Sequence, residues 1–219
     1  MDDLALLAQS DLFSTLDQDA LRLMLTGART VRCGRNNQLF SEGEEAEELY
    51  VVRSGRVAIA KRSSDGRESV LALMESGDLF GEMPLFDGEH RSAHARALEN
   101  TELLVVPYPP IKSVLEERPE LLWEVVALLS RRLRAENAAW ADSVFLDVTG
   151  RTAKRLLELA GEADEFLLPI TQEELAGLVG ASRERVNKAI AAFVRLGWIE
   201  QVDRRYRITD RDQLARRAR

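Results

Sequence analysis

The spacing of hydrophobic residues divides the chain into stretches of different character. Residues 1–30 carry leucines among polar residues, a pattern that predicts short helices. From Val31 to Val106, short apolar runs are separated by glycines at intervals of roughly ten residues, which predicts an antiparallel roll or barrel. The Asp65-Gly66 pair between two of these runs predicts a hairpin turn.

A long helix is predicted after the β-region, which ends at a cluster of prolines from Pro107 to Pro110. The helical stretch follows Pro119 and reaches about Leu146. Its hydrophobic residues recur with heptad spacing at Leu122, Val126, Leu129, Leu133 and Trp140. Such a stripe is typical of a coiled-coil seam and needs a partner helix. The alternative is that the stripe packs on the chain's own β-domain.

One core position of this seam is polar. The heptad places Glu136 there, with Asn137 beside it. Polar residues in a seam cost stability and therefore need a reason. Either they fix the register of a dimer, or they face a polar ligand bound between two subunits; the spacing alone does not choose between the two.

The C-terminal part contains the signals of two short helices joined by a tight turn. Asp147 is a predicted N-cap that marks a domain boundary, and Thr171 to Glu174 fits a capping box. Gly180-Ala181 then supplies a turn, and Ser182 caps a second helix expected to reach Gly197. This combination predicts a helix-turn-helix.

The second helix has an apolar face and a polar face that suits DNA. Arg can donate to guanine, Glu can accept from cytosine, and Lys or Asn can reach neighbouring base edges. The predicted DNA-contacting residues are Ser182, Arg183, Glu184, Arg185, Asn187 and Lys188. A β-hairpin with a basic tip at 203–205 is expected to follow, between strands at 198–202 and 206–209, which makes the fold a winged helix.

A candidate anion site lies at the end of the β-region. Gly81 permits close approach of the backbone, and the segment Glu82–Phe86 is expected to form a short helix that exposes its N-terminal amide groups. Glu82 is a candidate acceptor for sugar hydroxyls. Arg91 and Ser92 supply a charge and a hydroxyl for a phosphate.

Charge and composition narrow the function further. The net charge is -7, but from Gly180 onward there are 11 Lys/Arg against 5 Asp/Glu, so basic charge gathers where a nucleic-acid surface is predicted. Cys33 is the only cysteine, which excludes an intramolecular disulfide and a multi-cysteine metal site. No signal sequence and no membrane span are recognisable, so we expect a cytoplasmic protein.

Together these segments resemble the CRP/FNR family, most of all its cyclic-AMP receptor branch. The resemblance rests on the β-roll with its GE(x8)RS spacing, the long helix, FLDVTGR at Phe145–Arg151, and ITQEELAGLVGASRERVNKAI at Ile170–Ile190. It implies an α+β fold with a β-roll ligand-binding domain at 1–108, a dimerisation helix region at 109–146 and a winged-helix DNA-binding domain at 147–219.

The resemblance also implies a function. The chain would be a homodimeric transcription regulator, not an enzyme, with RNA polymerase as a partner and no cofactor besides an allosteric ligand. Arg183, Glu184 and Lys188 would read a palindrome of TGTGA-like half-sites. The residues implied for cyclic AMP are Gly81, Glu82, Arg91 and Ser92 of the roll, and Arg132, Glu136 and Asn137 of the long helix, the last two from both subunits.

Other hypotheses remain open at this point. Glu136, and Pro84 with its missing N–H, motivate a regulator that needs no ligand. A second alternative is a cyclic-nucleotide-sensing interaction module without a DNA function. His90 and His94 have a spacing that on a helix suits a metal, but they flank Arg91-Ser92 at the start of a predicted strand. No nucleophile–base pair is recognisable, which argues against an enzyme.

Overall fold

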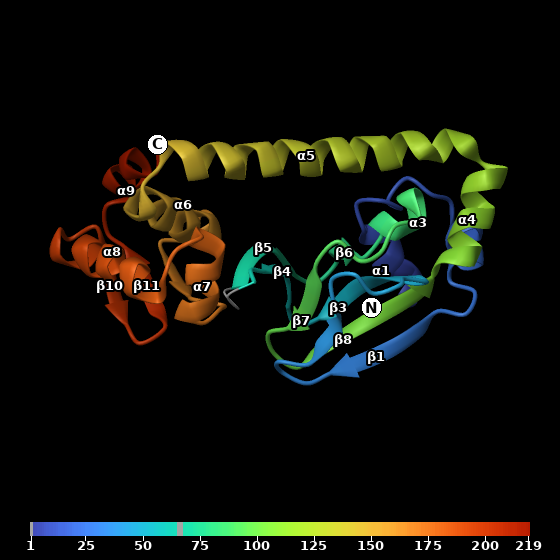
Figure 1. Cartoon of the computed structure of the whole chain (residues 1–219), viewed down its shortest axis with the longest axis horizontal. Coiled ribbons are helices and arrows are strands. Elements are labelled where there is room, and N and C mark those ends of the chain that lie inside the picture. The colour runs from blue at the N-terminus through green and yellow to red at the C-terminus, as the bar shows by residue number, and fades with distance from the viewer. Residues whose placement is uncertain (1, 65–67) are drawn as a thin grey trace. The chain divides into compact units, whose positions relative to one another are not determined.

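The computed structural model describes residues 2–64 and 68–219. The chain forms two compact units, residues 1–133 and 134–219, and the division falls inside the long helix rather than at the predicted boundaries of 108 and 146. The chain combines helices with antiparallel sheets, which confirms the predicted α+β class (Figure 1). The predicted Asp65-Gly66 turn lies outside the described residues.

The N-terminal unit contains two four-stranded antiparallel sheets, one with the order β1-β8-β3-β6 and the other with the order β2-β7-β4-β5. The strands are β1 Arg29–Cys33, β2 Gln38–Phe40, β3 Glu48–Ser54, β4 Val57–Arg62, β5 Glu68–Met74, β6 Leu79–Phe80, β7 His94–Ala97 and β8 Thr101–Pro107. The helices are α1 Asp3–Gln9, α2 Gln18–Met24, α3 Met83–Asp87, α4 Tyr108–Glu117, the short 3₁₀ turn η1 Pro119–Leu121 and the first part of α5 Leu122–Phe145.

Strands β3 and β8 are buried on both faces, and their alternating side chains enter two different cores. One set faces the helices α1, α2, α4 and α5, and consists of Leu49, Val51, Leu104 and Val106. The other set faces the second sheet, and consists of Tyr50, Val52, Leu103 and Val105. The unit is therefore a two-sheet roll with a helical layer on one side, as the strand spacing predicted.

Helix α5 packs on this roll with a stripe that differs from the predicted seam. Val125 and Leu128 are buried in the helical core. The seam residues Leu122, Val126, Leu129 and Leu133 are all exposed in the single chain. The alternative in which the heptad stripe covers the chain's own β-domain is therefore wrong, because a neighbouring face of the helix does that.

The C-terminal unit is a winged helix-turn-helix, as predicted. It contains α6 Val148–Ala160, β9 Glu165–Leu167, α7 Gln172–Val179, α8 Arg183–Arg195, β10 Ile199–Val202, β11 Arg205–Ile208 and α9 Arg211–Arg217. Strands β10, β11 and β9 form one antiparallel sheet, with β11 in the middle. Helix α8 ends two residues before the predicted Gly197, whose φ of 71° terminates the helix in the left-handed region.

Three elements escaped the sequence analysis: α4, β9 and α9. Helix α9 packs on α6, with Leu214 fully buried. Its Arg217 forms an ion pair with Asp147, whose carboxylate also caps α6 by accepting from the Gly150 N–H at 2.8 Å. The Gly150 N–H and the Arg217 guanidinium hold the pKa of the Asp147 carboxyl below its usual range.

No helix among residues 2–64 and 68–219 is both long and apolar enough to cross a bilayer.

Candidate functional site

Gly81 begins the predicted ligand cassette, between β6 and α3. Its φ is 78°, a conformation that favours glycine. A Cβ atom at this position would lie 2.6 Å from Nη1 of Arg91. The positive φ favours glycine, and a larger residue would displace the Arg91 guanidinium. The GE part of the GE(x8)RS pattern therefore contacts the RS part at Gly81.

Arg91 is held inside the roll rather than at its surface. The residue is only 4% exposed, and its guanidinium donates from Nη1 to the Gly81 carbonyl at 2.8 Å and from Nη2 to the Glu48 carbonyl at 2.8 Å. The Tyr108 hydroxyl lies 3.3 Å from Nη1. The buried Nε–H has no hydrogen-bond partner among the described residues. Of the described carboxylates, none lies within ion-pair distance of this cation.

Aromatic rings complete the surroundings of this guanidinium. Its carbon Cζ lies 4.2 Å from the ring centroid of Phe40 and 5.5 Å from that of Tyr50. The rings of Phe40, Tyr50 and Phe80 contact one another, with centroids 5.2–6.1 Å apart. Such rings favour a cation over their faces and shield it from water, so Arg91 has an ordered position without a direct ion pair to a described carboxylate.

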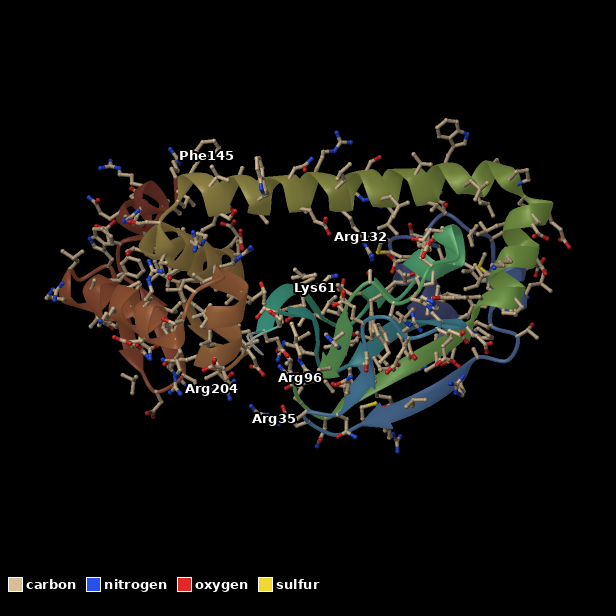
Figure 2. The ribbon with its side chains drawn as sticks, in the orientation of Figure 1. Arg35, Lys61, Arg96, Arg132, Phe145 and Arg204 are labelled. Atoms are coloured by element: carbon tan, nitrogen blue, oxygen red, sulfur yellow. The ribbon has the colours of Figure 1, made fainter. Side chains whose placement is uncertain are left out.

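Glu82 is also buried, at 1% exposure, and it pairs with Arg132 of α5. Arg132 additionally donates to the Leu79 carbonyl at 2.7 Å, and Figure 2 shows its side chain on the side of α5 that faces α3 and β6. Burial raises the pKa of the Glu82 carboxyl, and the Arg132 guanidinium opposes this rise. The structure thus brings Arg132 to Glu82 of the cassette, and its approach to a ligand stays a prediction.

The remaining cassette residues lie nearer the surface. Ser92 is exposed, and its hydroxyl lies 3.4 Å from the Met83 sulfur. Helix α3 starts at Met83, one residue later than expected, and Pro84 in its first turn has no N–H to offer. The backbone of this turn therefore offers an anion one donor fewer, and more depends on Arg91.

Glu136 and Asn137 are exposed on the part of α5 that belongs to the C-terminal unit. The single chain does not test whether they face a ligand or a second subunit. Their role stays a prediction.

The predicted recognition helix is α8. Its N-cap is Ser182, which accepts from the Arg185 N–H at 3.4 Å, and the preceding α7 begins with the predicted Thr171–Glu174 capping box. The apolar face is buried through Val186, Ala189, Ile190 and Phe193. The side chains at the start of the helix are exposed at Arg183, Glu184, Arg185 and Lys188.

Two details of α8 were not predictable from its composition. Lys188 forms an ion pair with Glu184 one turn earlier, with Nζ and Oε1 2.8 Å apart. Lys188 therefore lowers the pKa of the Glu184 carboxyl. Asn187 is half-buried, and its Oδ1 atom has no hydrogen-bond partner among the described residues. The N-terminal end of α8, which suits base contacts, thus presents an exposed ion pair between Glu184 and Lys188.

The tip of the wing is less free than expected. Asp203 and Arg204 form the turn, and Arg205 belongs to β11. Arg204 donates to the Leu168 carbonyl at 2.9 Å, and Arg205 pairs with Glu165 of β9 at 3.1 Å. Figure 2 shows Arg204 at this end of the C-terminal unit. Two of the basic side chains expected to contact phosphates therefore have partners within the unit, both supplied by the β9 segment that the sequence analysis missed.

Comparison with known proteins agrees with both halves of this site. A cyclic nucleotide-binding domain model matches residues 30–118, and a Crp-like helix-turn-helix domain model matches residues 150–217. A CRP-like cAMP-activated global transcriptional regulator of Mycobacterium tuberculosis is 38% identical over 221 residues, which cover 98% of this chain and 99% of that protein. The chain belongs to the CRP/FNR family. The cAMP-activated regulator CRP of Escherichia coli is 35% identical over 159 residues, 69% of this chain and 76% of that protein.

Solved structures of other CRP/FNR-family proteins share the fold. The Thermus thermophilus catabolite activator protein is 31% identical, with a TM-score of 0.54, over 95% of this chain and 98% of that chain. The c-di-GMP responsive regulator CLP of Xanthomonas campestris is 27% identical, with a TM-score of 0.76, over 88% of this chain and 99% of that chain. The ligands named for these relatives differ, being cAMP for some and c-di-GMP for another. Family membership therefore identifies the class of site but not the ligand.

Family membership establishes the general function: this CRP/FNR protein is a transcription regulator with a cyclic nucleotide-binding domain and a DNA-binding helix-turn-helix domain. The matched proteins are regulators rather than enzymes. Among residues 2–64 and 68–219, no group of three His, Cys, Asp or Glu side chains is arranged to hold a metal ion. His94 instead accepts from the Glu42 N–H at 3.2 Å, through Nδ1.

The sequence analysis missed the groups that fix Arg91: the Glu48 carbonyl, Tyr108 and Phe40. A carbonyl carries no side-chain signal. Tyr108 follows directly after the proline that ends the β-region, and an aromatic residue there is most simply a core residue. Only the fold brings these positions together.

Proposed function

We propose that this CRP/FNR-family protein is a homodimer whose affinity for DNA is controlled by cyclic AMP. The relatives that are 35–38% identical are named as cAMP-activated regulators, which supports this ligand. The proposal joins three parts: an anion site in the roll, a dimer seam on α5, and a pair of recognition helices.

The observation that carries the proposal is the state of Arg91. Arg91 is a buried guanidinium with no described carboxylate within ion-pair distance, and a nearby anion would stabilise it. The cyclic phosphate has the charge and the acceptor oxygens for this, and charge-assisted hydrogen bonds are the stronger kind. Glu82, one residue from Gly81, is suited to accept from a ribose hydroxyl, and Ser92 adds an exposed hydroxyl.

The exposed heptad stripe of α5 supports the dimer. Four large apolar side chains at heptad spacing point to solvent in the single chain, and Trp140 continues the stripe with 69% exposure. A second copy of the helix would cover them by coiled-coil packing. Glu136 and Asn137 would then lie at or beside the seam and reach a ligand from both subunits.

Dimerisation sets the form of the DNA site. Two recognition helices about 34 Å apart span one turn of DNA and read a palindrome. Arg183, Glu184 and Lys188 are suited to the base edges of TGTGA-like half-sites. The ligand would stabilise one packing of the two α5 helices and so fix this separation.

The test is a titration of the purified full-length protein with cyclic AMP, in the presence and absence of operator DNA. Coupling is reciprocal, so DNA should tighten ligand binding by the factor by which ligand tightens DNA binding. Cyclic GMP and c-di-GMP serve as competing ligands. Equal cyclic AMP affinity with and without DNA would defeat the allosteric part, and tighter binding of c-di-GMP would defeat the choice of ligand.

A second candidate, a ligand-independent regulator controlled by its abundance, is favoured by the Glu82–Arg132 pair. These two groups satisfy each other within the chain and do not require a ligand. No heat and no thermal shift with any of the three nucleotides, together with tight operator binding, would support this version. Sedimentation measures the oligomeric state. A monomer that binds the palindromic operator tightly would contradict both candidates.

A further inference from the structure

Tyr108 touches both halves of the ligand cassette from outside it. It is the first residue of α4 and is 5% exposed. Its hydroxyl is within hydrogen-bond distance of the Gly81 carbonyl and 3.3 Å from Nη1 of Arg91. Gly81 belongs to the GE half of the pattern and Arg91 to the RS half, so one phenol spans the two.

The chemistry of these groups allows only one arrangement of the proton. A carbonyl oxygen can only accept, and a guanidinium can only donate. Tyr108 therefore donates its O–H to Gly81 and accepts from Arg91. Burial raises the pKa of Tyr108 to about 12, so the hydroxyl keeps its proton at neutral pH and the direction of both hydrogen bonds is fixed.

Tyr108 also supports the second acceptor of Arg91. Its backbone N–H donates to the Glu47 carbonyl at 2.8 Å, and the next carbonyl along the chain, that of Glu48, accepts from Nη2 of Arg91. The start of α4 thus anchors the guanidinium through Nη1 directly and through Nη2 by way of the neighbouring strand. What remains without a partner is the Nε–H.

We propose that Tyr108 is a positioning residue, which holds the Arg91 guanidinium against the Gly81 backbone, at the place where the anionic group of the ligand would bind. This inference rests on the proposed function, because it assumes that Arg91 binds a cyclic phosphate. An arginine side chain has many rotamers, and ordering it before the ligand arrives lowers the entropic cost of binding. Tyr108 does not touch the ligand in this scheme.

The experiment compares Tyr108→Phe with Tyr50→Phe in the full-length protein, by calorimetry with cyclic AMP. Tyr50 is a matched control: its ring also lies beside Arg91, but its hydroxyl donates to the Glu48 carboxylate at 2.8 Å and not to the guanidinium's surroundings. A hydrogen bond to a charged group corresponds to roughly a tenfold change in affinity. We expect that loss for Tyr108→Phe, and less than about a twofold change for Tyr50→Phe.

A purely structural role for Tyr108 would give a different pattern. In a double-mutant cycle, Tyr108→Phe should have little further effect once Arg91 is replaced by Lys, which has no guanidinium for the Tyr108 hydroxyl to hold. An undiminished tenfold effect in the Arg91→Lys background would overturn the proposal. Equal losses in the two tyrosine variants would overturn it as well.

A measurement without added nucleotide separates this inference from the proposed function. The side-chain N–H signals of Arg91 in ¹⁵N-labelled protein should exchange with solvent faster in Tyr108→Phe than in the wild type or Tyr50→Phe. Unchanged exchange would overturn the positioning role. If the wild type binds no cyclic AMP but exchange rises as expected, the ligand assignment fails while the ordering of Arg91 by Tyr108 stands.

Discussion

The two units use the same kinds of charged residue in opposite ways. Arg91 and Glu82 of the roll are 4% and 1% exposed, and each is fixed by several neighbours. Lys188 and Glu184 of α8 have side chains that are 75% and 77% exposed and contact mainly each other. A small anion is best bound by buried, ordered groups in a dry site, whereas base edges must be reached by side chains that project from the surface. The buried charges should therefore respond far more strongly to substitution.

The largest effect is expected for Arg91→Ala. It removes the buried cation that we propose binds the cyclic phosphate, and a hydrogen bond between charged groups contributes roughly 1.5–3 kcal/mol. Cyclic AMP affinity should fall by about 100-fold or more, and ligand-enhanced DNA binding should be lost while the dimer stays intact. The control is Arg29→Ala, whose guanidinium pairs with the Glu48 carboxylate at 2.8 Å and is half-exposed. If calorimetry finds equal cyclic AMP affinities for the two variants, Arg91 is not the anion-binding residue.

A smaller and different effect is expected for Arg183→Ala. A bidentate contact to a base contributes about 1–3 kcal/mol of discrimination, so the preference for the operator over altered half-sites should weaken by that amount. Ligand affinity should not change, because Arg183 belongs to the other unit. Arg195→Ala, at the far exposed end of α8, is the control in the same binding assay. Equal protection of the operator by wild type and Arg183→Ala would show that α8 is misassigned.

The smallest effect is expected for the pH dependence of stability, to which Glu82 and Glu184 should contribute with opposite signs. The pKa of Glu82 is raised above its usual 4.5, so the folded state keeps the proton up to a higher pH than the unfolded state does. The free energy of unfolding should therefore decrease as the pH rises from 4.5 through the raised pKa. The pKa of Glu184 is lowered by Lys188, so its contribution is present above 4.5 and is lost as pH falls through the lowered pKa. Denaturant unfolding of Glu82→Gln and Glu184→Gln against wild type should show these opposite slopes; parallel curves would refute the contrast.

The helix-turn-helix of the C-terminal unit could be predicted from the sequence because its signals are local. A capping box, a glycine in the left-handed region and a serine N-cap lie within about one helical turn of the groups they organise, and all three were confirmed at Thr171, Gly180 and Ser182. The polar face of α8 follows directly from its periodicity. What was missed there, β9 and α9, has too few residues to show a period.

The ligand unit was predictable in outline but not in its contacts. The cassette residues could be named because glycine, glutamate, arginine and serine each have a chemical role at that spacing. The groups that orient them come from positions 33 to 43 residues away, such as the Glu48 carbonyl, or from another element, such as Tyr108. Such contacts depend on sheet register and on how α4 leaves the roll, which no local pattern specifies.

The contact between Arg217 and Asp147 brings the last turn of α9 to the first turn of α6. The DNA-binding fold therefore starts and finishes at one place, although 70 positions of sequence separate the two residues. Adjacent ends of this kind are the arrangement in which circular permutation and domain insertion are tolerated. A circular permutant in which residues 147 and 217 are linked and new termini lie in a surface loop should therefore still fold and bind DNA.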